Sequence, residues 1–287
     1  MLTTWAPDAL LALPVALAAA YGVLLARHRA ARRRGAATAY PAWRALPVVL
    51  GLLLLVWAVA GWPAARRAQE AWPLALSLGL VTAVVPFLLG LGDPVRLLEE
   101  GHGGPVALLH GRAARVLTFP LVASVLSAAV LTLAVTSGWF TDARTRPEAW
   151  SSLQVVALLL GLLVTVPLLV EGLLPAWCGP ALRALFAFSD GLLDAVPGIV
   201  ALGSLDWLTG QTLVAVAESV GVPLVLVTLV QWARADEEGA RALDARLDAA
   251  VAPPPADGRP TPTGPTTGPD RPWWESDPRL AGRYGRR

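Results

Sequence analysis

Cysteine and methionine occur once each, and lysine not at all, in this sequence of 287 residues. Cys178 is the only cysteine and Met1 the only methionine, and all 23 residues of the Lys and Arg class are arginine. A single cysteine excludes an intrachain disulfide and a cysteine metal cluster. Without an internal methionine, the chain also has no thioether to offer a soft metal ion inside the membrane.

Histidine and charge are scarce as well. The three histidines, His28, His102 and His110, lie outside every expected membrane span, and charged residues make up only 15% of the chain. A nucleophile–histidine pair inside the membrane is therefore excluded, and the sequence has no nucleotide-binding glycine loop and no HExxH motif. We expect no enzymatic activity and no nucleic-acid partner.

Long apolar runs dominate what is present. Hydrophobic residues make up 55% of the chain, and the mean hydropathy is +0.56. Runs of about 20 apolar residues predict an all-α polytopic protein in a lipid bilayer, a bundle of seven transmembrane helices. The expected spans are about Ala9–Ala26, Ala45–Trp62, Trp72–Leu91, Val116–Ser137, Leu153–Leu174, Ala181–Leu205 and Gly210–Trp232.

Arginine placement predicts the orientation. A basic block runs from Arg27 to Arg44 directly after the first apolar run, where a signal peptide would carry its charge before the run. Because basic loops stay in the cytoplasm, we expect the N-terminus outside and the C-terminus inside a bacterial cell membrane. Arg66, Arg67, Arg144 and Arg146 then fall outside.

The sequence predicts three regions. A transmembrane domain is expected over residues 1–235, and residues 236–251 are expected to form a cytoplasmic amphipathic helix, because Leu243 and Leu247 recur at helical spacing. A solvated extension of the last span is an equal alternative. Residues 252–287 form a Pro-, Gly- and Thr-rich disordered tail. Its Trp273 and Trp274 are expected to dock on a partner or on the membrane surface.

One apolar span carries two acids near its middle. The stretch LFAFSDGLLDAVPGIVAL over residues 185–202 holds Asp190 and Asp194, which share one helix face a turn apart. A carboxylate at the bilayer centre costs about 2.5–3.5 kcal/mol, so the pair needs a compensating partner. The pair either locks helices together or forms a functional polar site.

Two further acids lie within the spans. Glu218 lies roughly 14 Å past the loop near Ser204–Thr209, and Asp194 lies roughly 16 Å before it, so the two are expected at one depth on antiparallel neighbours. Glu171 lies near the inner end of its span. We expect one acid to be protonated and to donate a hydrogen bond to another, or a bound cation to balance the cluster.

Several segments resemble the CtaG family of cytochrome c oxidase assembly proteins. They are PFLLGLGDPVRLL at 86–98, LTFPLVASVL at 117–126, DAVPGIVAL at 194–202, AVAESVGVPLVLVTLVQWARADEEGARALD at 215–244 and the closing PWWESDPRLAGR. The resemblance implies assembly of haem-copper cytochrome c oxidase, with copper delivered or inserted. It also implies contact with an oxidase subunit or another assembly factor.

The resemblance breaks at the metal ligands. Two histidines that many family members carry early in the third span fall on Leu74 and Leu78, and a further one falls on Asp194. Cu(I) prefers thiolate, thioether and imidazole ligands. No residue therefore takes the copper role by resemblance, and the metal and cofactor of this chain stay unknown. The alternatives are a small proton-coupled transporter that uses the carboxyl cluster, and a membrane scaffold without a ligand.

Overall fold

The computed structural model describes residues 4–35, 39–101, 119–170, 174 and 178–251. These residues form helices and contain no strand, as the all-α prediction expects. In chain order the elements are η1 (Ala9–Leu11), α1 (Ala12–Arg33), η2 (Ala42–Arg44), α2 (Ala45–Ala60), α3 (Trp62–Arg66), α4 (Trp72–Gly79), η3 (Leu80–Val84), α5 (Val85–Leu91), α6 (Pro94–Gly101), α9 (Pro120–Thr136), α10 (Gly138–Thr145), α11 (Pro147–Leu169), α12 (Pro180–Ser204) and α13 (Trp207–Val251).

Six helical segments of the described residues are long and apolar enough to cross a membrane. They are Ala9–Arg33, Ala42–Arg66, Trp72–Leu91, Pro147–Leu169, Pro180–Ser204 and Trp207–Asp248. A seventh exists if α9 and α10, which meet at a bend of 69°, count as one span. The prediction of a multi-pass helical membrane protein is confirmed, with six or seven spans. Its orientation stays a prediction.

The last helix runs without interruption across the boundary expected at residue 235. The contacts divide the chain into two units, Met1–Gly239 and Ala240–Arg287, and the helices up to the end of α12 all belong to the first. The three-region division stays a prediction. Glu171, the tail over 252–287 and its Trp273 and Trp274 lie outside the described residues.

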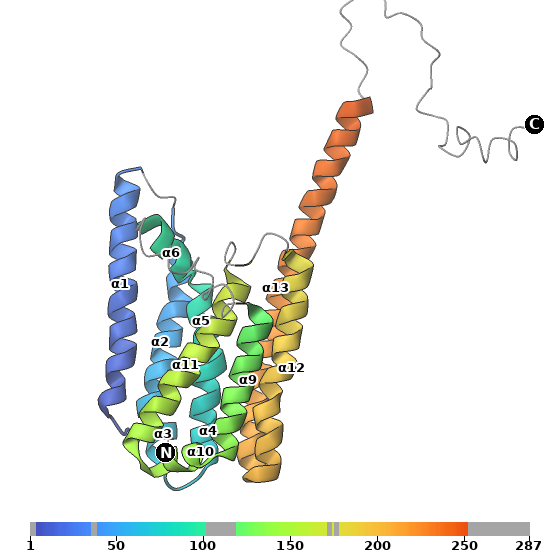
Figure 1. The fold of residues 1–287 in the computed structure, drawn as a ribbon. Helices are drawn as coiled ribbons and strands as arrows, with labels where there is room; N and C mark the ends of the chain where they lie inside the picture. Colours follow the sequence, from blue (N-terminus) through green and yellow to red (C-terminus); the bar gives the residue numbers. More distant parts are fainter. Residues whose placement is uncertain (1–3, 36–38, 102–118, 171–173, 175–177, 252–287) are drawn as a thin grey trace, which may run out of the picture. The chain divides into compact units, whose positions relative to one another are not determined.

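Helix packing places the centre of the first unit between α4–α5, α9, α11 and α12. α9 runs along α12, α2 along α5, and α11 packs against both α5 and α9 (Figure 1). Leu55, Leu74 and Trp150 are fully buried where α2, α4 and α11 meet. In contrast, α1 rests mainly on α6 and contacts α2 lightly.

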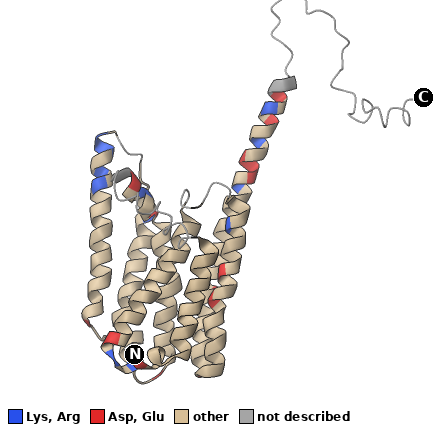
Figure 2. Cartoon of the chain, viewed as in Figure 1, with Lys and Arg blue, Asp and Glu red and all other residues tan. Residues whose placement is uncertain are grey.

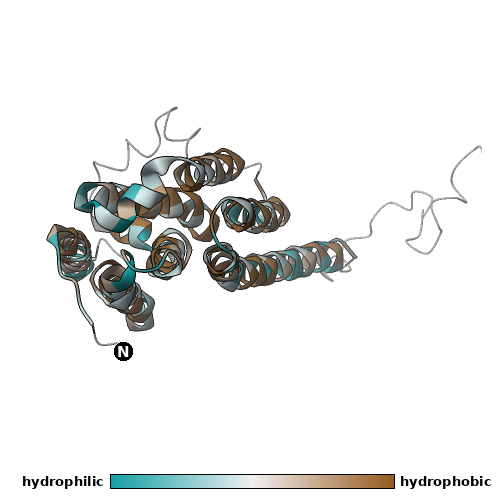
Figure 3. Ribbon diagram, turned by 90° about the horizontal axis from the view of Figure 1, so that it is seen from below, coloured by the Kyte–Doolittle hydropathy of each residue, from teal (hydrophilic) through white to brown (hydrophobic). Residues whose placement is uncertain are grey.

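Charge and hydropathy are arranged as a bilayer requires. Figure 2 shows charged residues concentrated toward the helix ends, with long uncharged stretches between them. Viewed along the helices, apolar residues are not confined to the inner faces (Figure 3). Leu53, Leu133 and Leu159 each expose about 60% of their surface. In lipid such outward leucines carry no penalty, so helix association rests on close packing and on hydrogen bonds.

Candidate functional site

Asp190 lies at the contact between α12 and α9. Its side chain is buried, and Ser124 of α9 donates its hydroxyl to Asp190 Oδ1 over 2.6 Å. That distance lies at the short end of the range for hydroxyl-to-oxygen hydrogen bonds. The serine therefore supplies the compensating partner that a carboxyl inside the membrane needs.

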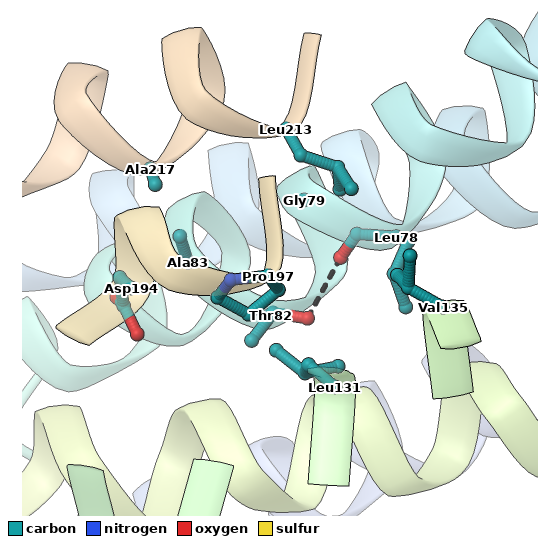
Figure 4. A pocket seen from close by; sticks show the side chains of 10 residues that line it. All are labelled: Leu78, Gly79, Thr82, Ala83, Leu131, Val135, Asp194, Pro197, Leu213 and Ala217. Carbon is teal, nitrogen blue, oxygen red and sulfur yellow. Dashed lines mark hydrogen bonds between the residues drawn. The ribbon is translucent and has the colours of Figure 1, made fainter. Parts of the chain in front are cut away.

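Asp194 lies one helical turn further along α12 and faces two small cavities. The larger has a volume of about 30 Å³ and is bounded by Thr82 and Ala83 of the third span, Leu131 of α9 and Ala217 of α13 (Figure 4). The smaller, of about 10 Å³, is lined by both aspartates. A water molecule needs about 10–15 Å³ of such space, so the larger cavity has room for water and none for an organic substrate.

Three hydroxyls from three other elements line the smaller cavity. They belong to Thr82 of η3, Ser127 of α9 and Thr165 of α11. The Thr82 hydroxyl donates to the Leu78 carbonyl over 2.8 Å, which leaves its oxygen free to accept a hydrogen bond. All the polar groups around the aspartates are thus oxygen atoms, which suit a proton, water or a hard cation.

A turn of π-helix at Leu80–Val84 brings Thr82 and Ala83 to these cavities. Pro86 has no N–H to donate to the Thr82 carbonyl, and its ring would clash with that carbonyl in a regular helix. The turn widens instead, and the Val85 N–H donates to the Leu80 carbonyl five residues earlier. Such turns are frequent at functional sites in helices.

Gly161 allows α11 to approach this π-turn. A Cβ atom at residue 161 would lie 1.9 Å from the Thr82 carbonyl oxygen and 2.6 Å from the Pro86 ring. Only a residue without a side chain fits there, because the two backbones touch. Gly161 thereby fixes the position of Thr82 against α11.

Glycines also set the contact between α12 and α13. A Cβ atom at Gly198 would lie 2.6 Å from Val214, and one at Gly191 would lie 3.8 Å from the Cα of Gly221. These pairs place Asp194 and Glu218 at one level of two antiparallel helices, as the loop length predicts. The structure does not bring the Glu218 side chain into the cluster, however. It is exposed, and its neighbour Ala217 faces Asp194.

A comparison with protein families matches residues 19–235 to the cytochrome c oxidase caa3 assembly factor family, Caa3_CtaG. The chain belongs to this family. Comparisons with curated proteins and with solved structures each gave no match. Membership confirms the resemblance drawn from the motifs at 86–98, 117–126, 194–202 and 215–244, most of which fall inside the matched range.

Two of the three positions assigned to CtaG-family histidines face one cavity. Leu78 and Asp194 both line the larger cavity, whereas Leu74 is fully buried in the core. Their donors do not fit Cu(I), because leucine offers none and a carboxylate favours harder ions. Within the described ranges, no group of three or more His, Cys, Asp or Glu residues lies close enough to hold a metal ion.

A second buried polar contact joins α2, α4 and α11. Ser77 of α4 donates to the Ala58 carbonyl of α2 over 2.8 Å and accepts from Gln154 of α11 over 3.1 Å. Sequence reasoning missed this contact and also Ser124, Thr82 and Gly161. Each of them is a small or polar residue in an apolar helix. Such a residue indicates a contact between helices, but it does not indicate which helix is the partner.

Proposed function

We propose that this chain acts within a bacterial cell membrane as a non-catalytic assembly factor for haem-copper cytochrome c oxidase, with Asp190 and Asp194 as its working site. The observation that carries the proposal is the pair itself, placed in a member of the caa3 assembly factor family. One carboxyl accepts from Ser124, and the other lies beside a cavity that has room for water, so the pair joins a fixed acid to one that can exchange a proton.

The two carboxyls differ in what they can do. Asp190 already accepts a strong hydrogen bond and is enclosed, so it holds its place as the fixed member. Asp194 faces the cavity and its carboxyl makes no hydrogen bond within the described part of the chain, so it takes up a proton or, with water and hydroxyl oxygens, a hard cation. Copper delivery is not part of this proposal, because the donors do not fit Cu(I).

Glu218 supports contact with another membrane protein. Its side chain is exposed in the middle of the last span, where a charge against lipid costs about 2.5–3.5 kcal/mol. Ala215 and Ser219 are exposed on the same face, and small residues let a second helix approach closely. A helix of an oxidase subunit or of another assembly factor, with a hydrogen-bond donor at this depth, would satisfy the carboxyl.

The test is oxidase assembly in cells that carry Asp194→Asn at normal protein abundance. The amide still forms hydrogen bonds and keeps the fold, yet it cannot exchange a proton or balance a cation, so assembly should fall. Asp142→Asn, an exposed change on α10, is the matched control and should have no effect. Full assembly in cells that carry Asp190→Asn, Asp194→Asn and Glu218→Gln together would contradict the proposal. The protein would then be a membrane scaffold without a ligand.

The transporter alternative is favoured by the position of Asp194 beside the cavities. It predicts proton flux in vesicles that hold the purified protein alone, and Asp194→Asn should abolish that flux. Assembly predicts instead that deletion of the protein removes the a-type haem signal from membrane spectra. If the vesicles show proton flux and the deletion strain keeps its haem signal, the function is transport and not assembly.

A further inference from the structure

The first helix is thinly attached along its length. Only 11% of its most apolar window is buried, and α1 makes its main contacts with α6. Two cavities follow one another between α1 and α2. One is lined by basic and aromatic residues and the other almost wholly by apolar residues, and an apolar cavity has no polar partners to hold water.

The cavity near the C-terminal end of α1 is basic. It has a volume of about 260 Å³ and is lined by His28, Arg29 and Arg32 of α1, by Tyr40, and by Ala42 and Ala45 at the start of η2 and α2. Figure 2 shows basic residues gathered at this end of α1. The end of α1 carries negative partial charge and the start of η2 and α2 positive partial charge, so the basic character of the cavity comes from the two guanidinium groups.

Tyr40 is held in place at the boundary of this cavity. Its hydroxyl donates to the Gly92 carbonyl and lies 3.3 Å from the Tyr21 hydroxyl, and its ring packs edge-on against His28. Burial, together with the Tyr21 hydrogen bond, raises the pKa of Tyr40, so the phenol stays neutral. The cavity therefore has a fixed wall and no anionic group among its lining residues.

The next cavity toward the N-terminus of α1 is apolar. It has a volume of about 170 Å³ and lies between α1 and α2, with Leu89 of α5, Pro94 of α6 and Leu162 of α11 behind it. Its remaining lining residues are Leu17, Ala20, Tyr21 and Leu24 of α1 and Val48 and Leu52 of α2. Tyr21 links it to the basic cavity through its contact with the Tyr40 hydroxyl. From Leu17 to Arg32 the helix rises roughly 22 Å, enough to cover one leaflet of a core about 30 Å thick.

Because a basic cavity is followed by an apolar one along α1, we infer that the space between α1 and α2 binds a phospholipid with an anionic headgroup. Arg29 and Arg32 contact the headgroup phosphate, since guanidinium groups match phosphate geometry. An acyl chain occupies the space beside Ala20 and Leu24. The site is separate from the aspartate pair and holds whether or not the proposed function is correct.

The experiment is native mass spectrometry of the purified, delipidated full chain with added phosphatidylglycerol or phosphatidylcholine of matched acyl chains. Phosphatidylglycerol should be retained at several-fold higher occupancy. Arg29→Gln with Arg32→Gln should abolish that preference, and Arg29→Lys with Arg32→Lys should keep most of it. Arg33→Gln with Arg34→Gln removes the same charge from the same helix end outside the cavity and should change nothing.

Two further arms separate a lipid from a free anion. Ala20→Phe fills the apolar cavity and should reduce phosphatidylglycerol occupancy although both arginines remain. Inorganic phosphate at equal concentration should not displace the lipid. Equal binding of the two lipids, an equal loss in the Arg33 and Arg34 control, or full displacement by phosphate would overturn the inference. Thermal unfolding of each variant verifies that lost binding does not reflect lost folding.

Discussion

At the scale of single residues, Ser124 and Asp194 decide what the acidic face of α12 can do. A buried Asp190 with a serine partner is a stable arrangement by itself, since one of its oxygens accepts a hydrogen bond of 2.6 Å. The second acid, Asp194, faces a cavity with room for water instead of a hydrogen-bond donor of its own. The difference between the two environments is the physical basis for assigning them different roles.

The donor chemistry of this cavity leads to a prediction about copper. Because Leu78 and Asp194 stand where family histidines are assigned, the purified protein should bind Cu(I) weakly or not at all. Replacing both by histidine places two imidazoles on one cavity and should raise Cu(I) affinity. Titration against a chromogenic Cu(I) chelator measures both. A tight stoichiometric complex in the wild type that survives loss of His28, His102 and His110 would contradict the prediction.

The sequence predicted the aspartates and could not predict their surroundings. The i, i+4 spacing of Asp190 and Asp194 and the depth of Glu218 follow from helical geometry alone. Which side of α13 Glu218 takes depends on the rotation of that helix about its axis. Gly198 and Gly221 set this rotation by permitting backbone contact, and such a contact needs the partner helix to be known.

At the scale of elements, close backbone contacts hold the site more tightly than side chains do. Gly161→Ala places a methyl group 1.9 Å from the Thr82 carbonyl and should destabilise the protein by about 1–3 kcal/mol or more. Gly203→Ala, in α12 with open space around its Cβ, is the control and should be neutral or stabilising. Thermal unfolding in detergent measures both changes. Equal shifts of the unfolding midpoint would show that the contact between Gly161 and the Thr82 carbonyl does not limit stability.

The start of α13 gives a second prediction at this scale, and it depends on pH. Asp206 accepts from the Thr209 amide over 2.9 Å and from the Thr209 hydroxyl over 2.6 Å. Although burial acts in the opposite direction, these hydrogen bonds lower the pKa of Asp206. A lowered folded-state pKa means that this stabilisation is present above the unfolded pKa, near 3.9, and is lost as pH falls through the folded value.

Asp206→Ala should therefore reduce stability at neutral pH by about 0.5–2 kcal/mol, toward the lower end because the side chain is exposed. The difference from wild type should shrink as the solution is acidified below pH 4. Unfolding midpoints at pH 7 and pH 3.5 measure it. A difference that stays constant with pH would mean that the carboxylate charge is not what caps α13.

At the scale of the whole molecule, the arginine distribution predicts an orientation that the fold leaves open. A reporter fused after Arg34 should read cytoplasmic and one fused after Arg146 should read external, because basic loops resist translocation. The reverse pattern would place the basic cavity of α1 in the outer leaflet. Hydropathy predicted seven spans, and the described residues give six, or seven if α9 and α10 count as one. The bend of 69° between these two helices was not predicted, because the fourth predicted span ends at Ser137, the residue that caps the start of α10.

The π-turn at Leu80–Val84 has a consequence for how this protein has to be compared with its relatives. A π-turn holds one more residue than a turn of α-helix, so it offsets the two halves of the span by about 100°. A homologue that lacks one residue here and has no proline at the position of Pro86 would form a regular helix, and its other motifs would still align with this chain. The residues of that homologue that align with Ser77 and Leu78, however, would turn away from Gln154 and Asp194. Identical residues in the two sequences would then lie on different faces of the helix.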